Sequence, residues 1–354
     1  MLFFDKVFLK PAKENLRGVE LFNLSLMRDL AQAGIKALVP IHYSWKEIFC
    51  RELGEAVPDF CEVGGKSSLS NGLCAVWRLC RWHMRRQRPK RIILANVANG
   101  LIPALCLMRL LWPRLEIILF AHRMPSKRFM AFLPGKRTRI LAVNKIIAAC
   151  FQKAGFVDAT VCFGHINADK FYPGESDAQG GEQKKVNFGV VGFLDNAWKG
   201  ADTAIAAFRA MPAEISADCA LHLASYRVPP SLPERNIAAY GWFPGAEMPD
   251  WLRRMDVMIV PSRDEHVMRE TFSLAMIEGM LTGLPVIASN LPILKEKLEA
   301  GGGYVFNDVG DLARLMALLA ANPELRRQLG AQARSIALER YVWNTKLFIS
   351  RYLE

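Results

Sequence analysis

Two glutamates eight residues apart, Glu270 and Glu278, have a spacing and a setting that suggest chemistry. Apolar residues at helical spacing follow Glu270, and Gly283 and Pro285 then predict a helix end before a short buried strand at 286–288. Glu270 is therefore expected just before a helix and Glu278 inside it. The backbone N–H groups at the start of such a helix lack partners and attract an anion. The stretch predicts a diphosphate at the helix tip, with a ribose near Glu278 and the group beyond the phosphate near Glu270.

Residues 269–290 resemble the two-glutamate motif of retaining GT-B glycosyltransferases of the group 1, or family-four, type. The resemblance rests on the two glutamates and on the residues that follow them, Gly279, Gly283, Pro285, Val286, Ile287 and Ala288. It implies that Glu278 binds the nucleotide ribose and that Glu270 lies by the donor sugar and orients its hydroxyls. It also implies transfer with retention by front-face attack, in which the leaving phosphate deprotonates the acceptor hydroxyl.

A lysine in the same half of the chain matches the family's donor-phosphate residue. Residues 189–208, GVVGFLDNAWKGADTAIAAF, resemble the family's glycine–loop–Lys-Gly segment, which implies a phosphate contact for Lys199. The family often has an arginine where this chain has Phe193, so one of two expected cations is missing. Arg263 and Arg269 are the candidates to replace it. Lys199 and the helix tip would together stabilise charge on the departing diphosphate.

Residues 263–269 precede Glu270 and contain Glu265, a rival for the role of the first glutamate. Glu270 is preferred because it alone stands eight residues before Glu278. Further donor contacts are expected at the helix tip and at glycines that match the family, namely Gly18, Gly192, Gly241, Thr271, Phe272 and Ser273.

His122 is the second candidate catalytic residue. It follows a predicted strand at 117–120, and open α/β sheets place ligand chemistry at the carboxyl ends of their strands. The resemblance implies a position beside the donor sugar. A structural histidine is the alternative interpretation.

The order of predicted elements and the resemblance indicate two Rossmann-like parallel-sheet domains that face a central cleft, the GT-B fold. Residues 1–172 would form an acceptor-binding domain and residues 186–335 a nucleotide-sugar-binding domain. The polar, glycine-rich stretch 173–185 reads as a linker. Residues 336–354 would form a C-terminal helix that packs back on the first domain.

The net charge of +12 is concentrated in the first half of the chain. Residues 1–170 contain 27 Lys or Arg and 12 Asp or Glu, whereas the remainder contains 19 and 22. This predicts an anionic partner, and no nucleic-acid-binding motif accompanies the charge, so a lipid surface or an anionic glycan is favoured. A solvated helix face is the alternative. The candidate membrane or acceptor patch contains Arg78, Arg81, Arg85, Arg86, Arg88, Lys90, Arg91, Arg123, Lys127 and Arg128.

No metal or other cofactor is expected. The eight cysteines form no Cys-x-x-Cys and no zinc-ligand spacing, and the Asp-x-Asp of metal-dependent GT-A transferases does not occur. The apolar start of the chain is too short for a secretory signal, and the apolar stretch 92–112 is interrupted by polar residues. These features predict a cytoplasmic protein, peripheral on the inner face of the cytoplasmic membrane.

The sequence therefore predicts retaining, metal-independent transfer of a sugar from a nucleotide-sugar donor to an anionic glycan or glycolipid. Lipopolysaccharide core, a lipid-linked oligosaccharide and a capsule precursor all suit the charge as acceptors. The alternatives are a catalytically silent GT-B binding protein and a same-fold nucleotide-sugar epimerase or phosphorylase. A nicotinamide-dependent oxidoreductase is disfavoured because the glycines after the 186–191 strand do not give the Gly-x-Gly-x-x-Gly spacing. Donor sugar, base, acceptor and oligomeric state remain open at this point.

Overall fold

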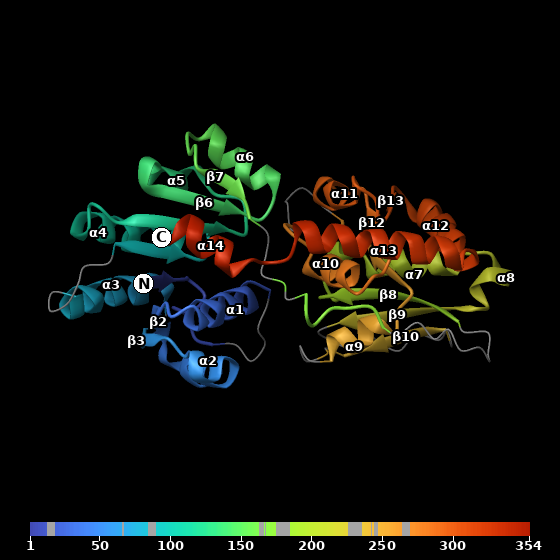
Figure 1. The fold of residues 1–354 in the computed structure, drawn as a ribbon, viewed down its shortest axis with the longest axis horizontal. Coiled ribbons are helices and arrows are strands. Elements are labelled where there is room, and N and C mark those ends of the chain that lie inside the picture. Colours follow the sequence, from blue (N-terminus) through green and yellow to red (C-terminus); the bar gives the residue numbers. More distant parts are fainter. Residues whose placement is uncertain are drawn as a thin grey trace. The chain divides into compact units, whose positions relative to one another are not determined.

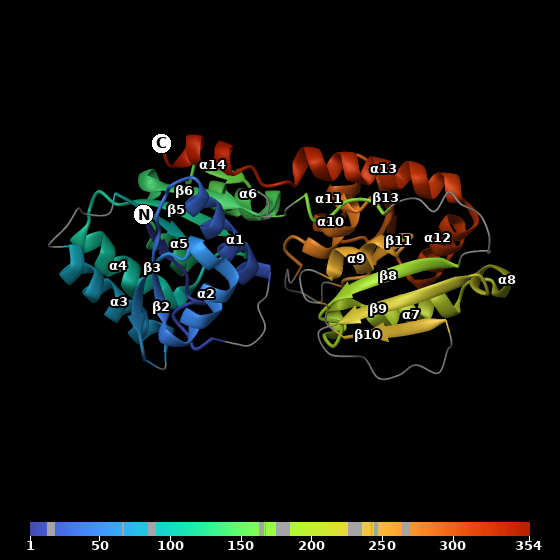
Figure 2. The same cartoon turned by 60° about the horizontal axis from the view of Figure 1, so that its bottom comes forward.

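The structure is a computed structural model of the whole chain, drawn in Figures 1 and 2. It describes residues 1–12, 18–65, 67–83, 90–162, 166, 168–174, 185–225, 236–241, 243, 247–263 and 270–354. Contacts divide the chain into two units. The first unit contains Met1–His165 and Trp343–Glu354, and the second contains Ile166–Val342.

The first unit is built on a seven-stranded parallel sheet with strand order β3-β2-β1-β4-β5-β6-β7. Most of its strand residues are apolar and buried, as expected for a parallel sheet covered on both faces. The strands are β1 Leu2–Phe4, β2 Leu38–His42, β3 Asp59–Val63, β4 Arg91–Leu94, β5 Glu116–Ala121, β6 Thr138–Ala142 and β7 Ala159–Val161.

Helices connect these strands and supply the apolar residues that bury the sheet. They are α1 Gly18–Gln32, α2 Lys46–Leu53, α3 Ser68–His83, α4 Ile102–Leu111, α5 Lys127–Ala131 and α6 Lys145–Lys153. Helices α1 and α2 share one core with β1, β2, β4 and β5. Gly34 follows α1 with φ 76°, the left-handed conformation in which a glycine commonly ends a helix.

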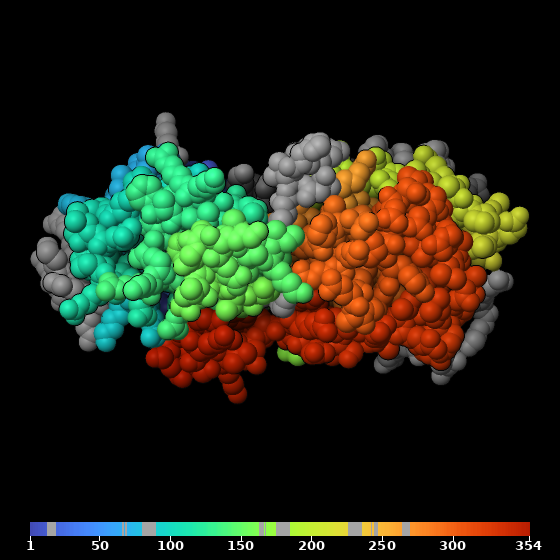
Figure 3. All heavy atoms as spheres, turned by 90° about the horizontal axis from the view of Figure 1, so that it is seen from above, coloured from blue at the N-terminus to red at the C-terminus, as the bar shows by residue number. Residues whose placement is uncertain are grey.

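The last helix of the chain, α14 (Thr345–Tyr352), belongs to the first unit. Phe348 is buried and packs on Phe120 of β5, with ring centroids 5.7 Å apart. The Tyr352 hydroxyl lies 3.2 Å from the Thr160 hydroxyl on β7. In Figure 3 this deep red segment lies on the surface of the first unit beside the green residues around α6 and β7.

The second unit has a six-stranded parallel sheet with strand order β10-β9-β8-β11-β12-β13. Its strands are β8 Val186–Gly192, β9 Cys219–Ser225, β10 Ile237–Tyr240, β11 Val257–Val260, β12 Val286–Ser289 and β13 Gly303–Phe306. Its helices are α7 Ala201–Arg209, α8 Ala213–Ser216, α9 Met248–Arg253, α10 Leu274–Leu281, α11 Pro292–Leu298, α12 Val309–Ala321 and α13 Pro323–Arg340.

Successive residues of a strand in this unit point to opposite faces of the sheet, and each face is covered by different helices. Val257 and Ile259 of β11 join the core that α7 and α12 cover. Met258, between them, faces α10, where a Cβ on Gly279 would come within 3.0 Å of its side chain. The absence of a side chain at Gly279 therefore lets α10 lie close to the sheet, and this fixes the helix that carries Glu278.

The division into units can be set beside the domain limits expected from the sequence. Residues 166–172 lie in the second unit, because the Arg334 guanidinium on α13 donates to the Phe171 carbonyl at 3.0 Å and the Phe171 ring is buried. Residues 336–340 complete α13 in that unit, and the chain joins the first unit from Trp343. Most of the expected linker, 175–184, lies outside the described residues.

Candidate functional site

The loop that follows β8 is fixed against the end of β11 by a glycine. It carries a single 3-10 turn, Ala197–Lys199, and then Gly200 with φ 70°. A Cβ at Gly200 would lie 1.9 Å from the Pro261 carbonyl oxygen, so another residue cannot occupy this position without displacing backbone. The Arg263 N–H also donates to the Trp198 carbonyl at 2.6 Å. Two neighbouring loops are thereby joined, and Lys199 is placed at the carboxyl edge of the sheet.

Lys199 and Glu270 form a buried ion pair at this edge. The Lys199 Nζ lies 2.6 Å from Glu270 Oε2, and the Ser262 hydroxyl donates to the same oxygen at 3.0 Å. The side chains of Glu270 and Lys199 are 8% and 17% exposed, and Ser262 is fully buried. Charge-assisted hydrogen bonds of this kind are short and strong where water is excluded. The structure thus brings together two residues that the sequence analysis assigned to phosphate and donor sugar.

The backbone between Glu270 and α10 is strained. Ser273 has φ 61° and is the only residue other than glycine with positive φ in the part of the chain that the structure describes. Such a conformation costs on the order of 1–3 kcal/mol and tends to occur at ligand sites. The helix begins at Leu274, so the apolar periodicity that starts at Phe272 runs ahead of the helix itself. The anion site predicted at 271–273 is therefore a tight turn that leads into the helix.

Glu278 lies in the second turn of α10 and is half-buried. Among the described residues, no hydrogen bond reaches its carboxylate. Burial raises the pKa of Glu278 to about 7. Gly283 follows α10 with φ 82°, as predicted for the helix end, and β12 begins at Val286. A half-buried carboxyl that titrates near neutral pH and has no protein partner is suited to accept hydrogen bonds from ligand hydroxyls.

Lys297 is a site residue that sequence reasoning missed. It lies on α11, is 2% exposed, and its Nζ lies 5.0 Å from the centre of the Phe272 ring and 5.6 Å from that of Tyr341. Its one hydrogen bond among the described residues is to the Ile293 carbonyl at 3.3 Å. Burial lowers the pKa of Lys297 to about 8, while Glu296 and Glu270 act in the opposite direction. A buried lysine therefore packs against Phe272 of the strained turn. The sequence around a single lysine in a helix does not indicate that it is buried.

The first unit has a different group of polar atoms at the carboxyl edge of its sheet. Asn96 follows β4 and His122 follows β5, and Asn23 of α1 donates to Asp5 after β1 at 2.5 Å. Asn23 Oδ1, Asn96 Oδ1 and His122 Nε2 are shielded from solvent and have no hydrogen-bond partner within the described part of the chain. Buried polar atoms are rarely left unsatisfied, so these three mark a place where a ligand's hydroxyls would bind.

Burial shifts the pKa of two groups at this edge. Burial, with a smaller effect of Arg123, lowers the pKa of His122 to about 4, so the imidazole is uncharged at neutral pH. Its ring packs edge-on against Phe22 at a centroid distance of 4.9 Å. Burial also raises the pKa of Asp5 to about 6.

Comparison with known protein families finds a match to the part of the chain that contains Lys199 and Glu270. Residues 185–322 match the family model described as "Glycosyl transferases group 1". This part of the chain is a group 1 glycosyltransferase domain. The match includes Lys199, Glu270 and Glu278, and it confirms the family resemblance stated from the sequence.

The curated relatives match shorter stretches of the chain. An uncharacterized 41.2 kDa protein in the cps region of Klebsiella pneumoniae is 35% identical over 86 residues, which are 23% of this chain and 23% of that protein. A D-inositol 3-phosphate glycosyltransferase of Streptomyces bingchenggensis is 34% identical over 101 residues, 28% of this chain and 21% of that enzyme. The chain thus spans less than a quarter of the length of each of these relatives.

A solved structure covers the whole fold. Anabaena HepE in complex with UDP matches with a TM-score of 0.72 at 16% identity, over 99% of this chain and 98% of that chain. Together with the two parallel sheets, this confirms the predicted fold class, a pair of Rossmann-like domains of the GT-B type.

The structure also shows where the remaining predicted donor-site residues lie. Gly18 is the first residue of α1, Gly192 ends β8 beneath the Lys199 side chain, and Gly241 follows β10. The Phe272 ring packs on Tyr341 with centroids 6.3 Å apart. The adjacent Thr271 is half-exposed.

Of the two proposed substitutes for the missing cation, the structure describes only Arg263. The Arg263 guanidinium pairs with Asp202 near the start of α7. Arg269 and the rival acid Glu265 lie outside the described residues.

The predicted basic patch occupies two opposite edges of the first unit's sheet. Lys90 and Arg91 precede or begin β4 and lie at the amino edge, whereas Arg123, Lys127 and Arg128 follow β5 at the carboxyl edge. A parallel sheet separates these groups by the length of its strands. The patch residues whose side chains are not described are Arg81, Arg85, Arg86 and Arg88.

Two members of the patch have structural partners. Arg78 of α3 donates to the Glu62 carbonyl. Arg91 pairs with Glu116 at 2.9 Å and donates to the Leu353 carbonyl after α14. Arg91 is therefore paired with an acid within the first unit, whereas the bond of Arg78 to a carbonyl positions its guanidinium without neutralising it.

Within the described residues, no helix is both long and apolar enough to cross a membrane. The same part of the chain contains no group of three or more His, Cys, Asp or Glu placed to bind a metal ion.

Proposed function

We propose that this chain transfers a sugar, with retention and without a metal ion, from a nucleotide-sugar donor to an anionic glycan or glycolipid acceptor at the cytoplasmic face of the membrane. The observation that carries the proposal is the buried Lys199–Glu270–Ser262 cluster next to the strained turn that leads into α10. The glycosyltransferase family match over the same residues supports it.

The ion pair would rearrange when the donor binds. The Lys199 ammonium group is paired with Glu270, the residue before the turn at 271–273, and a diphosphate there would compete with Glu270 for it. The Glu270 carboxylate would then accept hydrogen bonds from hydroxyls of the donor sugar. As the sugar–phosphate bond breaks, Lys199 and the N–H groups of the turn would stabilise the charge on the departing oxygens.

Retention follows if the acceptor attacks from the side of the leaving group. The departing phosphate oxygen would take the proton of the acceptor hydroxyl, so no enzymic nucleophile is required. Glu270 would orient the sugar rather than attack it. His122 would remain a neutral hydrogen-bonding group, because its pKa of about 4 makes it a poor general base at neutral pH.

The acceptor class is proposed from charge and from the relatives. The first 170 residues contain more than twice as many basic as acidic residues. One relative lies in a cps region and another acts on D-inositol 3-phosphate, a phosphorylated polyol. We therefore propose lipopolysaccharide core, a lipid-linked oligosaccharide or a capsule precursor as acceptor.

A panel of nucleotide sugars tests the function, with UDP-sugars first because HepE was solved with UDP. We expect slow hydrolysis of the correct donor, a rise in melting temperature with that donor alone, and no loss of activity when EDTA is added. The Glu278→Ala variant serves as control and should lose both donor effects. Donor binding without any hydrolysis or transfer would instead indicate a catalytically silent binding protein. Release of free nucleotide with an epimerised sugar, or phosphorolysis, would indicate a same-fold epimerase or phosphorylase.

A further inference from the structure

The amino edge of the first unit's sheet carries an exposed apolar tip. Helix α4 runs antiparallel to the strands and ends there at Leu111, just before β5 begins. Leu110 is 78% exposed and Leu111 is 40% exposed, although the next residue, Trp112, is buried. Leu110 is left almost wholly in water and Leu111 partly so, and two adjacent leucines exposed at the end of a helix suggest a partner surface.

Cations surround this tip. Between residues 64 and 157 the sequence contains 18 Lys or Arg and a single acid, Glu116, which pairs with Arg91. Strand register places the segments before β5 and before β6 side by side at the amino edge. These segments and the end of α4 present four exposed cations, namely Arg109, Arg114, Lys136 and Arg137. The next acid, Asp158, is exposed just before β7 at the margin of this surface.

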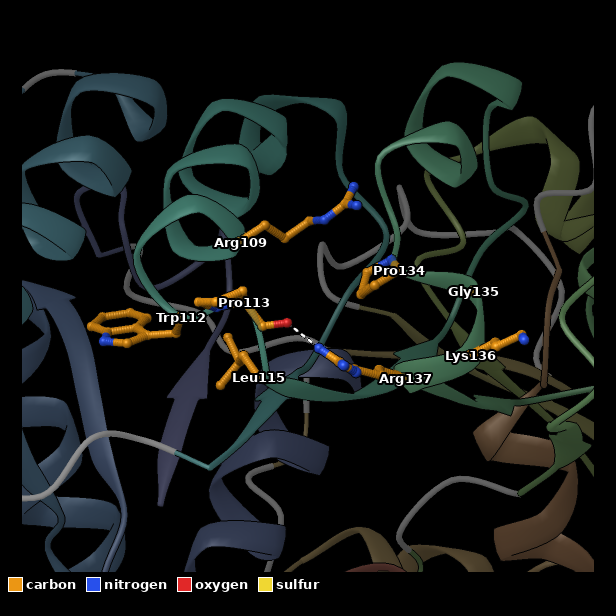
Figure 4. Close-up of a pocket in the computed structure, with 8 residues that line it drawn as sticks. All are labelled: Arg109, Trp112, Pro113, Leu115, Pro134, Gly135, Lys136 and Arg137. Atoms are coloured by element: carbon orange, nitrogen blue, oxygen red, sulfur yellow. Dashed lines mark hydrogen bonds between the residues drawn. The ribbon is translucent and has the colours of Figure 1, made fainter.

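A cavity of about 270 Å³ lies between these cations. Figure 4 shows Arg109 extending from α4 toward Pro134, while Arg137 reaches back to the Pro113 carbonyl. Arg109 also donates to the Phe132 carbonyl at 3.1 Å. Each guanidinium has five N–H donors, so one carbonyl bond positions the group without exhausting it. The cavity is lined by Arg109, Trp112, Pro113, Leu115, Pro134, Gly135, Lys136 and Arg137.

We propose that this surface, the tip of α4 with its four cations and the cavity, docks the protein on an anionic lipid bilayer. Leu110 and Leu111 enter the interfacial region, and a lipid phosphate occupies the cavity against Arg109 and Arg137. Weak apolar insertion combined with several cations is the usual basis of reversible attachment to anionic membranes. The proposal rests on the proposed transfer to a membrane acceptor and adds the surface that faces the membrane.

The position of this surface limits the acceptor. Strand β5 has six residues and rises ~3.3 Å per residue, so His122 at its carboxyl end lies roughly 20 Å from the docked edge. The reacting hydroxyl therefore belongs to a sugar well removed from the lipid, as in an oligosaccharide, rather than to the sugar joined to the lipid.

Vesicle co-sedimentation of the full-length protein tests the docking surface. Vesicles of phosphatidylcholine alone are compared with vesicles that contain one-third phosphatidylglycerol, at low and at high salt. We expect binding to the anionic vesicles only, with affinity falling steeply as salt rises. Leu110→Ser/Leu111→Ser and Arg114→Gln/Lys136→Gln should each reduce partition by about tenfold. The matched controls in the second unit, Leu338→Ser at an exposed leucine of α13 and Arg254→Gln/Lys295→Gln, should bind as the unaltered protein does.

Equal binding by all variants, or no binding to anionic vesicles, would overturn the docking surface. Analytical ultracentrifugation tests the alternative that the leucines bind a second copy of the chain. If the leucine variant loses a self-associated species but binds vesicles normally, the membrane-docking proposal is overturned. Donor hydrolysis without vesicles is measured in parallel and should not change in either surface variant. Failed docking with intact hydrolysis would therefore leave the proposed function standing, whereas absent hydrolysis with normal docking would refute the function alone.

Discussion

The carboxyl edge of the second unit's sheet has a buried, internally paired charge, whereas the same edge of the first unit's sheet has buried neutral side chains with polar atoms that lack partners among the described residues. In the second unit, Lys199 and Glu270 satisfy each other at 2.6 Å. In the first unit, Asn23, Asn96 and His122 each have a buried polar atom without a partner among the described residues. The two edges come from similar parallel sheets, so the difference lies in the side chains that the loops present.

This difference fits two kinds of ligand. A paired charge can exchange its partner for a diphosphate, because a new anion replaces an old one at the same cation. Unpaired neutral atoms instead gain hydrogen bonds when uncharged hydroxyls arrive, and they offer little to a phosphate. The second edge thus suits a nucleotide diphosphate and the first edge suits sugar hydroxyls. The four variants described below test this contrast.

Lys199→Ala should have the largest effect. Removing the cation that stabilises the leaving group should lower turnover by about 100-fold or more. It also leaves Glu270 buried without a counter-ion, so the melting temperature should fall. The double variant Lys199→Ala/Glu270→Gln should regain much of the melting temperature but none of the turnover. Recovery of turnover in the double variant would show that Lys199 serves only to neutralise Glu270.

Glu278→Gln should weaken nucleotide binding in a pH-dependent way. The pKa of Glu278 is about 7, so the carboxylate that binds ribose hydroxyls becomes populated as pH rises through neutrality. Hydrogen bonds to a charged group are the stronger ones, and we expect about tenfold weaker binding than the unaltered protein at pH 8 but similar binding at pH 6. Isothermal titration calorimetry with UDP measures this, and a ratio that does not change with pH would contradict it.

The pH dependence of stability at Glu278 has a defined direction, which the same variant tests. The folded pKa of Glu278 lies above the ordinary value of 4.5, so the folded state holds more protons than the unfolded state between these two pH values. Stability contributed at this site therefore falls as pH rises from 4.5 to 7. Glu278→Gln should remove that fall, which denaturant titrations at several pH values would detect.

Asn96→Ala should impair transfer without affecting the donor. Asn96 Oδ1 has no hydrogen-bond partner within the described part of the chain, so the melting temperature should change little. One lost hydrogen bond to an acceptor hydroxyl should raise the acceptor KM about fivefold and leave donor hydrolysis unchanged. The matched control is Asn144→Ala, because Asn144 caps α6 by accepting from the Ile147 N–H at 2.8 Å. The control should lose about 1 kcal/mol of stability and keep its acceptor KM. The opposite pattern in the two variants would mean that the first edge is purely structural.

Lys297→Met should have the smallest effect. Methionine has a similar shape and carries no buried charge, so the melting temperature at neutral pH should stay the same or rise slightly. Turnover should fall only about threefold, as the field of a buried cation near Glu270 is lost. The folded pKa of Lys297 is about 8 against an ordinary 10.5, so the unfolded state holds more protons between these values. Stability should therefore rise with pH across that window in the unaltered protein, and the variant should lack this rise.

Much of the fold could be predicted because the relevant signals are local. Apolar runs mark the buried strands at 92–95, 117–120 and 286–288. Gly34 and Gly283, which both have positive φ, follow the ends of α1 and α10. Helix α10 begins at Leu274 although Phe272 continues the apolar pattern, because Ser273 adopts a left-handed conformation. Periodicity reports which side of a helix is apolar, and it does not report the φ of a single serine.

The candidate site could be predicted only in part. Lys199 and Glu270 were each assigned a role from family motifs, but their direct contact joins residues 71 positions apart. Lys297 was missed, since one lysine in a helix is ordinarily solvated and its burial depends on Phe272 and Tyr341. The basic residues were treated as one group, although Lys90 and Arg123 belong to opposite edges of the sheet.

The sequence by itself determined the elements, their order and the residue types at the ends of the strands, because these depend on neighbours within a few positions. The tertiary structure decided which loop ends meet. Strand order sets β8 beside β11 and β4 beside β5, and so it decides that one edge is paired and charged while the other keeps unfilled acceptors. Burial, too, is decided by the tertiary structure. Because removal from water penalises the charged form, burial raises the pKa of Glu278 and lowers the pKa of Lys297 and of His122, which favours the neutral form of each.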